Sequence, residues 1–248
     1  MTLDSDKDLE ALKRIGHIVA QTLEEMRRHV LPGVSTGELD HIGETVLHTH
    51  GAKSAPVLVY NFPGTTCISL NDEAAHGIPG SRVVQPGDLV NLDVSAELDG
   101  YFADAAVTVA VPPVSPLQAR LINCTHNALQ KGMRAARSNR PLNVIGRAVE
   151  REARRCGFFI IPELGGHGVG RSIHEKPRMV PNFYDPADHR RLREGMVITI
   201  EPFLTPGSGW IFTAEDGWTL KTKDGSLSVQ FEHTVVITRG RPIVVTTL

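Results

Sequence analysis

The chain has 248 residues, of which 41% are hydrophobic and 22% charged, and its formal net charge at pH 7 is −2. This composition is typical of a globular protein with a substantial core, and a near-neutral charge without a basic run does not favour nucleic acid or a membrane surface as a partner. The apolar runs are shorter than a membrane span, and the three cysteines show no CxxC spacing. We therefore expect a cytoplasmic protein with reduced thiols, in which carboxylate and imidazole groups hold any metal.

Two helix pairs are predicted, and each is followed by strands. Ser35 with Glu38 forms a capping-box pattern, and Ser115 followed by Pro116 is typical of a helix start. Apolar residues recur at intervals of three and four within the helices. The expected helices cover about 6–30, 36–50, 116–138 and 143–156. The expected strands and loops are strands at 56–60 and 66–70, a polar loop at 71–80, a hairpin at 87–111, and strands at 158–162, 195–201, 218–221, 226–238 and 242–246.

The order of helix pair and strands occurs twice, which indicates an internal architectural repeat. The two halves cover about 6–112 and 113–248, and the connection between them is too short to act as a flexible linker. We expect one α+β domain, 1–248, with curved antiparallel strands inside and the helix pairs outside. Such an arrangement would place a site between the halves.

The segment 87–111 carries the first sign of chemistry. Its two alternating runs flank Asp99-Gly100, a dipeptide that favours a two-residue hairpin turn. In that register Asp93 and Asp104 are diagonal neighbours on one face, about 7 Å apart at Cα. Like charges at this distance repel, so either one carboxyl group stays protonated or a cation lies between them, for which two divalent metal ions are suited. A solvated face that happens to carry two aspartates is the alternative.

Three histidines lie in glycine-rich segments. His76 is in a Gly/Pro-rich loop, and His167 and His174 are in the segment 165–177, GGHGVGRSIHEKP. Glycines allow the backbone to approach a ligand or another strand closely. The segment matches neither phosphate-binding pattern, GxxxxGK[ST] or GxGxxG, so phosphate binding is not favoured.

Two glutamates end or interrupt β-rich segments. Glu201 follows four β-branched residues and precedes a proline, and Glu232 lies in an alternating run. Each alone could be half of a salt bridge. Four carboxylates would balance two divalent ions, and with one imidazole they suit manganese, iron, cobalt or zinc, which sequence cannot distinguish. Such ions could activate a shared water for amide hydrolysis. The predicted ligand set is Asp93, Asp104, His167, Glu201 and Glu232.

These segments in this order resemble the type I methionine aminopeptidases of peptidase family M24, which have the pita-bread or creatinase-like fold. The resembling segments are HGIP, NLDVSAELDGYFADAAVT, GHGVGRSIHEKP, TIEPF and QFEHTVV. The short bacterial form is the most similar. The resemblance implies an enzyme that removes the initiator methionine from nascent proteins and peptides with a small second residue. It also implies two divalent metal ions per chain, work on nascent chains near the ribosome, and a monomer.

The resemblance further implies a role for each motif residue. Asp104 and Glu232 would bridge both metals, Asp93 would complete one, and His167 with Glu201 the other. Glu201 would also transfer protons, and His76 and His174 would contact the scissile region. The remaining implied pocket residues, which would bind the methionine side chain, are Tyr60, Phe62, Cys67 and Trp218.

Two pocket positions depart from the pattern of the family. Many members have an aromatic residue where Val59 stands and phenylalanine where Ile173 stands, so we expect a more aliphatic pocket that also tolerates leucine or norleucine. Two alternatives remain at this point. One is a proline-directed peptidase such as an Xaa-Pro aminopeptidase or prolidase. The other is a binding protein that kept the fold and lost catalysis.

Overall fold

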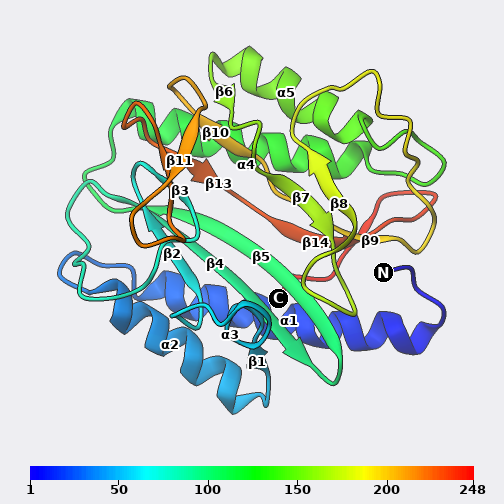
Figure 1. The fold of residues 1–248 in the computed structure, drawn as a ribbon, viewed down its shortest axis with the longest axis horizontal. Coiled ribbons are helices and arrows are strands. Elements are labelled where there is room, and N and C mark those ends of the chain that lie inside the picture. The colour runs from blue at the N-terminus through cyan, green and yellow to red at the C-terminus, as the bar shows by residue number, and fades with distance from the viewer.

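Two helix pairs flank the strands in the computed structural model, which describes residues 1–248. Figure 1 shows α1 and α2 along one edge and α4 and α5 along the other, with the long strands running between them. The arrangement agrees with the predicted α+β class. The helices are α1 (Asp6–Arg28), α2 (Thr36–Thr49), α3 (Ala55–Tyr60), α4 (Pro116–Ala135) and α5 (Val144–Cys156).

The strands form four sheets, of which two are large. One has the order β1-β4-β2 with β5 paired to β4, and the other has the order β15-β14-β9-β7-β8; every ladder is antiparallel. The smaller sheets are β13-β10-β6 and β11-β12-β3. The strands are β1 (Lys53–Ser54), β2 (Cys67–Leu70), β3 (Glu73–Ala75), β4 (Leu89–Leu98), β5 (Tyr101–Ala110), β6 (Phe159–Ile160), β7 (Gly165–Gly168), β8 (Glu175–Pro181), β9 (Val197–Ile200), β10 (Phe203–Thr205), β11 (Ile211–Thr213), β12 (Leu220–Thr222), β13 (Val229–Gln230), β14 (His233–Val236) and β15 (Ile243–Val244).

The helix ends follow the local signals in the sequence. The capping box of Ser35 and Glu38 is present at α2, and Ser115 forms another with Gln118 at α4. Side-chain oxygens in these boxes satisfy backbone N–H groups that have no partner within the helix. Gly157 ends α5 in the left-handed conformation, which glycine adopts without strain.

The hairpin of β4 and β5 has the predicted register. Leu98 lies opposite Tyr101 and Ser95 opposite Asp104, with the turn at Asp99-Gly100, where both residues have positive φ. Its apolar face packs with α1 and α2 into the largest hydrophobic cluster of the chain. The opposite face is therefore left to present its carboxylates to the second half of the molecule.

Two predicted segments have a different structure. The predicted strand at 56–60 is wrong, because α3 occupies these residues: Ser54 caps the helix by accepting a hydrogen bond from Val57 N–H, and Pro56 stands in its first turn. Capping and proline placement outweighed the β propensity of the valines here. The predicted polar loop at 71–80 contains β3, which pairs with β12.

The C-terminal strands are shorter than predicted. The single strand expected at 226–238 is two strands, β13 and β14, and Phe231 and Glu232 lie between them. The strand expected at 218–221 begins only at Leu220. The gap between β13 and β14 leaves irregular backbone at Glu232, where this segment runs beside β5.

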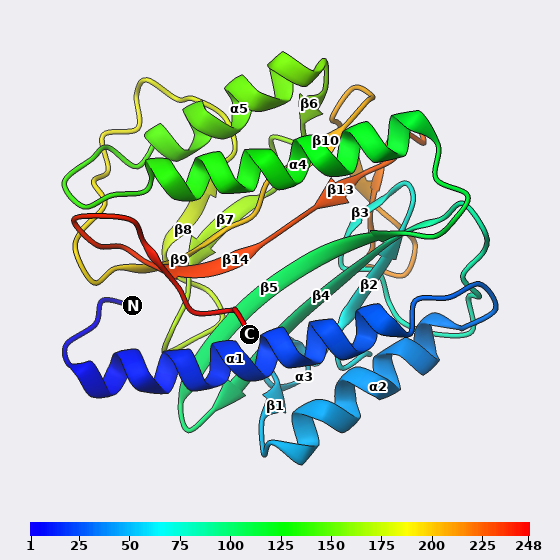
Figure 2. The same ribbon diagram turned by 180° about the vertical axis from the view of Figure 1, so that it is seen from behind.

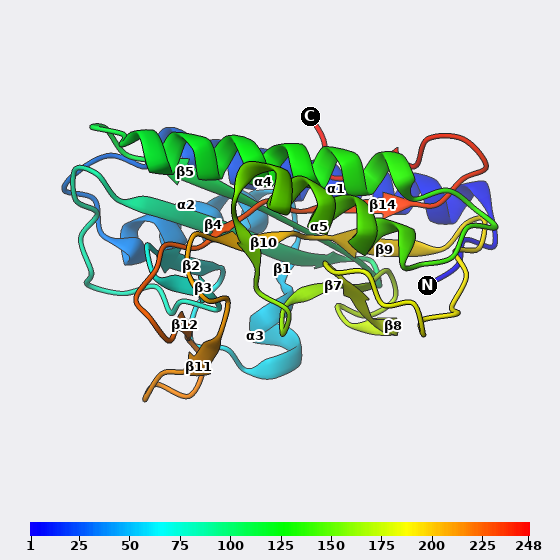
Figure 3. The same ribbon diagram turned by 90° about the horizontal axis from the view of Figure 1, so that it is seen from above.

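The two long helices α1 and α4 lie on the side of the molecule opposite α3 and the small strands. In Figure 3, α1 and α4 lie along the top, while α3, β11 and β12 lie along the bottom. Figure 2 shows β5 of the first half running beside β14 of the second. No helix combines the length and apolar character needed to cross a membrane. The division of the domain at about residue 112 stays a prediction.

Candidate metal centre and active site

Acidic and histidine side chains from both halves meet where β5 approaches β7, β9 and β14. Metal-ligating atoms of Asp104, His167 and Glu232 all lie within 4.8 Å of one another, and all three residues are buried. His167 Nε2 is 3.7 Å from Asp104 Oδ2 and 3.6 Å from Glu201 Oε1. Asp93 and Glu201 line the same cavity as these three residues. All five predicted ligands are thus brought together.

Glycines in β7 allow His167 to reach this group. A Cβ on Gly166 would lie 2.2 Å from the Thr199 carbonyl oxygen, and one on Gly168 would lie 2.4 Å from that of Lys176. Only glycine therefore permits β7 to pack this closely between its neighbours. The glycines of 165–177 serve strand packing, in agreement with the rejection of a phosphate loop.

Thr199 links two of the metal-ligand candidates, and sequence reasoning missed it. Its hydroxyl accepts a hydrogen bond from His167 N–H at 3.0 Å and donates one to Glu201 Oε1 at 2.9 Å. Thr199 stands two residues before Glu201, and residues two apart share a face of a strand. This spacing could have indicated from the sequence that the two side chains are neighbours.

Gln230 was also missed. Its Nε2 lies 3.3 Å from both Glu201 Oε2 and Glu232 Oε2, and the residue is buried. The amide thus donates towards two carboxylates, one directly after β9 and one between β13 and β14. Gln230 stands two residues before Glu232, and this spacing could have indicated from the sequence that the two side chains are neighbours.

Burial dominates the electrostatics of the group. It raises the pKa of Asp93 to about 7. It also raises the pKa values of Asp104, Glu201 and Glu232 well above their ordinary range, and for these three the neighbouring carboxylates raise the pKa further. Burial lowers the pKa of His167 to about 3, so its imidazole is neutral at pH 7 and can ligate a metal.

The donor set fits divalent cations. Asp104 Oδ1 and Glu232 Oε1 are buried without a hydrogen-bond partner, and no lysine or arginine forms an ion pair with Asp93, Asp104, Glu201 or Glu232. Buried carboxylates without partners are costly, and binding to a metal ion removes that cost. Oxygen donors with one neutral imidazole suit the first-row metals manganese, iron, cobalt and zinc.

His76 and His174 lie next to this group. The His174 ring is 4.1 Å from that of His167, centroid to centroid, and its Nδ1 is 2.5 Å from the Tyr60 hydroxyl. Burial, with His76 nearby, lowers the pKa of His174, and burial lowers that of His76. His76 has a φ of 56°, an uncommon left-handed conformation for a residue other than glycine. Both imidazoles are therefore neutral at pH 7 and face the cavity.

A cavity of about 360 Å³ contains the five predicted ligands and both of these histidines. Phe62 and Trp218 form one wall in an edge-to-face pair with ring centroids 5.2 Å apart. Residues proposed from the sequence for the pocket that line this cavity are Tyr60, Phe62, Cys67, Trp218 and Ile173. Lining residues that were not predicted are Pro56, Ala75, Ser95, Glu163, Leu164, Gly165, Arg178, Met179 and Phe203.

Val59 is the predicted pocket residue that the structure does not place at the cavity. Its side chain is 41% exposed on α3 and is absent from the lining, whereas Tyr60 of the same helix is present. The prediction treated 56–60 as a strand. In a helix consecutive side chains point in different directions, so Val59 turns away from the neighbour that reaches the cavity.

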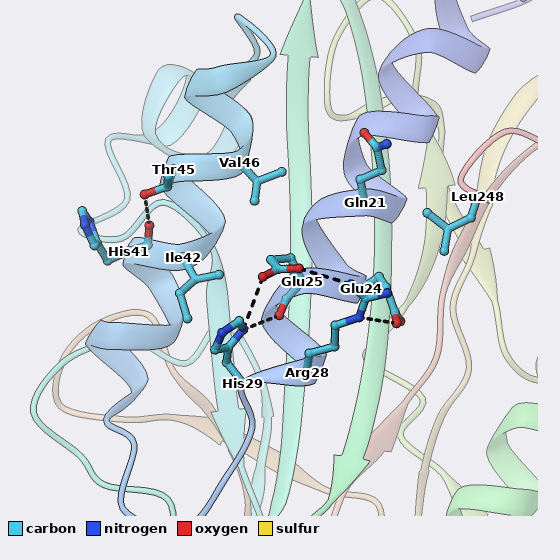
Figure 4. Close-up of a pocket in the computed structure, with 10 residues that line it drawn as sticks. All are labelled: Gln21, Glu24, Glu25, Arg28, His29, His41, Ile42, Thr45, Val46 and Leu248. Carbon is cyan, nitrogen blue, oxygen red and sulfur yellow. Dashed lines mark hydrogen bonds and ion pairs between the residues drawn. The ribbon is translucent and has the colours of Figure 1, made fainter.

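A second hollow lies between α1 and α2 (Figure 4). Its acidic side chains already have partners: Glu24 pairs with Arg27 and Arg28, and Glu25 with Arg28 and His29. It contains no buried carboxylate without a partner. These features favour a solvated surface between two helices, and the cavity at Asp104 as the site of chemistry.

The whole length of the chain is similar to bacterial aminopeptidases. It is 49% identical to Methionine aminopeptidase 2 of Bacillus subtilis, with 100% of both chains covered, and 43% identical to Methionine aminopeptidase of Staphylococcus epidermidis, with 99% of this chain and 98% of that one covered. The crystal structure of methionine aminopeptidase from Thermotoga maritima superposes with a TM-score of 0.96 at 32% identity, with 100% of both chains covered.

A more distant structure shares the fold but less of the sequence. Prolidase from Pyrococcus furiosus gives a TM-score of 0.79 at 22% identity, with all of this chain covering 66% of that one. That similarity supports the pita-bread fold alone. The model of Metallopeptidase family M24 matches residues 10–239, which contain every predicted ligand. With its buried carboxylate and histidine centre, this chain belongs to metallopeptidase family M24.

Proposed function

We propose that this chain is a methionyl aminopeptidase that hydrolyses the first peptide bond of proteins and peptides beginning with methionine and a small second residue. The observation that carries the proposal is the buried group of Asp104, His167 and Glu232 at a cavity with sulfur and aromatic walls. The names of its full-length relatives support the same activity. Thioether side chains pack favourably against aromatic rings, which suits this cavity to methionine.

Each ligand has a role in this proposal. Asp104 and Glu232 would contribute to holding two divalent ions, Asp93 would help to hold one of them, and His167 with Glu201 would help to hold the other. When bound, the ions would lower the pKa of a shared water and polarise the scissile carbonyl. We propose manganese, iron, cobalt or zinc as the metals.

The remaining residues handle protons and orientation. Glu201, held by Thr199 and Gln230, would receive a proton at its carboxylate and deliver it to the leaving amine. A Tyr60 hydroxyl that donates to Nδ1 leaves the proton of neutral His174 on Nε2, where it can stabilise the developing oxyanion. His76 would support the same region.

The substrate pocket is proposed with one revision. Phe62, Trp218, Cys67 and Ile173 would enclose the methionine side chain, and Val59 is left out because it does not reach the cavity. We also propose that the chain acts as a monomeric single domain on nascent chains in the cytoplasm, near the ribosome, and binds neither nucleic acid nor membrane. The two alternatives are not favoured, since all five ligands and both histidines are present and no feature of the cavity indicates a preference for proline.

Release of free methionine tests the proposal. The chelated protein, reconstituted with one metal at a time, should release methionine from Met-Gly-Met-Met and Met-Ala-Ser, and more slowly release leucine or norleucine from matching peptides. Equal cleavage of Ala- and Met-peptides would contradict the assigned specificity. No release with any metal, from protein that binds two ions, would contradict the activity, and an Xaa-Pro peptide in the same panel tests the alternative peptidase.

A further inference from the structure

The two halves of the chain meet along β5 and residues 230–234, which run side by side (Figure 2). The contacts fall at alternate residues. Glu232 N–H donates to the Ala106 carbonyl at 2.9 Å, and on either side of it a threonine hydroxyl makes the contact. These three contacts define what we call the seam, formed by Asp104 with Thr234, Ala106 with Glu232, and Thr108 with Gln230.

The two threonine contacts are reciprocal. The Thr234 hydroxyl, from the second half, accepts from Asp104 N–H at 3.0 Å and donates to the Asp104 carbonyl at 2.8 Å. The Thr108 hydroxyl, from the first half, accepts from Gln230 N–H at 3.1 Å and donates to the Gln230 carbonyl at 2.8 Å. Each half thus uses one threonine to hold the backbone of the other.

A hydroxyl is suited to this task because it can donate and accept at once. In an antiparallel ladder the N–H and C=O groups of one residue exchange bonds with one facing residue, so each threonine replaces such a partner. Thr234 and Thr108 are 0% and 4% exposed. Removing either hydroxyl would leave a buried N–H and a buried C=O without water to replace it.

The seam carries one proposed metal ligand from each half. Asp104 is held directly by Thr234, and Glu232 lies between the two threonine contacts. Gln230, held by Thr108, also donates to the Glu232 carboxylate. The separation of the two carboxylates therefore depends on how closely the halves approach here.

We propose that Thr234 and Thr108 are positioning residues whose hydroxyls hold the two halves in register, so that Asp104 and Glu232 bind the same metal ions. The inference rests on the metal centre of the proposed function. It assigns these threonines a role beyond folding, because the residues they hold are the ones that must share an ion.

Valine tests this role because it keeps the shape of threonine without the hydroxyl, and serine keeps the hydroxyl. Mn²⁺ binding to chelated protein is measured by calorimetry for the parent, Thr234→Val and Thr234→Ser. Loss of such an outer contact is expected to weaken Mn²⁺ binding about 10–100-fold in Thr234→Val. Thr234→Ser is expected to stay close to the parent. The matched control is Thr22→Val, since Thr22 is equally buried and its hydroxyl bonds only to Ile18 O within α1.

Each outcome decides one question. A folded Thr234→Val protein with the parent's Mn²⁺ affinity and stoichiometry would overturn the positioning role. Equal weakening in Thr22→Val would also overturn it, because the effect would then be a general loss of stability. If Thr234→Val does not fold, the same comparison on Thr108→Val and Thr108→Ser decides in the same way. A parent protein that binds none of Mn²⁺, Fe²⁺, Co²⁺ and Zn²⁺ would instead contradict the metal centre of the proposed function.

Discussion

Asp104 and Glu232 differ from ordinary buried carboxylates because each keeps an oxygen without any hydrogen-bond partner. A buried charge in that condition is costly, and the raised pKa values of both groups express the same cost. His174 differs from both, because its ring lies beside the group and its Nδ1 already contacts Tyr60. Substitutions of residues that hold metal should therefore weaken metal binding, whereas substitutions of residues that act on the substrate should lower kcat and leave metal binding intact.

Replacement of Asp104 by asparagine tests that separation. Asp104→Asn keeps the shape but removes a negative charge from the group, so Mn²⁺ binding should weaken by more than about 100-fold, beyond the loss expected for an outer contact. Methionine release should fall with it. Calorimetry and a peptide assay measure the two effects.

His174→Ala provides the comparison. It should retain metal and lose about 10²–10³ in kcat, the loss typical of removing one oxyanion donor. Normal metal content in Asp104→Asn, or metal loss in His174→Ala, would contradict the roles proposed for these residues.

At the scale of elements, the position of His167 depends on close packing of β7 against β9. Gly166 has no space for a Cβ beside the Thr199 carbonyl, and the same Thr199 holds His167 N–H through its hydroxyl. A side chain at 166 would therefore push apart the two strands that carry His167 and Glu201. Stability and metal binding should change together.

Gly166→Ala should lower the free energy of unfolding by about 1–3 kcal/mol, the usual cost of overpacking, and should weaken Mn²⁺ binding. Urea unfolding and calorimetry measure these effects. Gly80→Ala is the matched control, because no atom lies within 4 Å of its Cβ and its φ is not positive. The control should change stability by less than about 0.5 kcal/mol. A Gly166→Ala protein as stable as this control would show that the strands can move apart without cost.

At the scale of the whole molecule, the metal centre links folding to pH. At pH 7 the metal-free folded state keeps protons on Asp104, Glu201 and Glu232, whose pKa values are raised well above their ordinary range, and is part way through losing the proton of Asp93, whose pKa is raised to about 7. The unfolded chain has lost these protons by pH 7. Histidines with lowered pKa values, such as His167, are neutral in both states above pH 7 and contribute nothing there.

The stability of the metal-free protein should therefore fall as pH rises from 7 to 8.5, by about 1.4 kcal/mol per pH unit for each proton that only the folded state keeps. Bound Mn²⁺ takes the place of the protons and should flatten this dependence. Urea unfolding of chelated and loaded protein measures both slopes, and Asp93→Asn should reduce the slope of the chelated form. Equal slopes with and without metal would contradict the coupling.

The sequence alone determined features that depend on neighbours along the chain. Capping residues such as Ser35 fixed helix starts, and Asp99-Gly100 fixed a turn that set the register of ten pairs between β4 and β5. That register makes Asp93 and Asp104 diagonal neighbours on one face of the hairpin. The remaining ligands followed from a resemblance carried by short motifs, and the structure brings all five together.

Only the tertiary structure decided features that depend on contacts between distant segments. One such feature is which side chain of α3 reaches the cavity: Tyr60 contacts the distant His174 there, and Val59 does not line the cavity. Thr199 and Gln230 gain their carboxylate and histidine partners when separate segments of the second half pack together, and Thr234 gains Asp104 when the two halves meet. A hydroxyl or amide has no preferred partner until folding places one within about 3 Å. For this reason motifs in the sequence could name the proposed ligands, whereas spacing alone offered only a weak signal for Thr199 and Gln230 and none for the contact of Thr234 with Asp104.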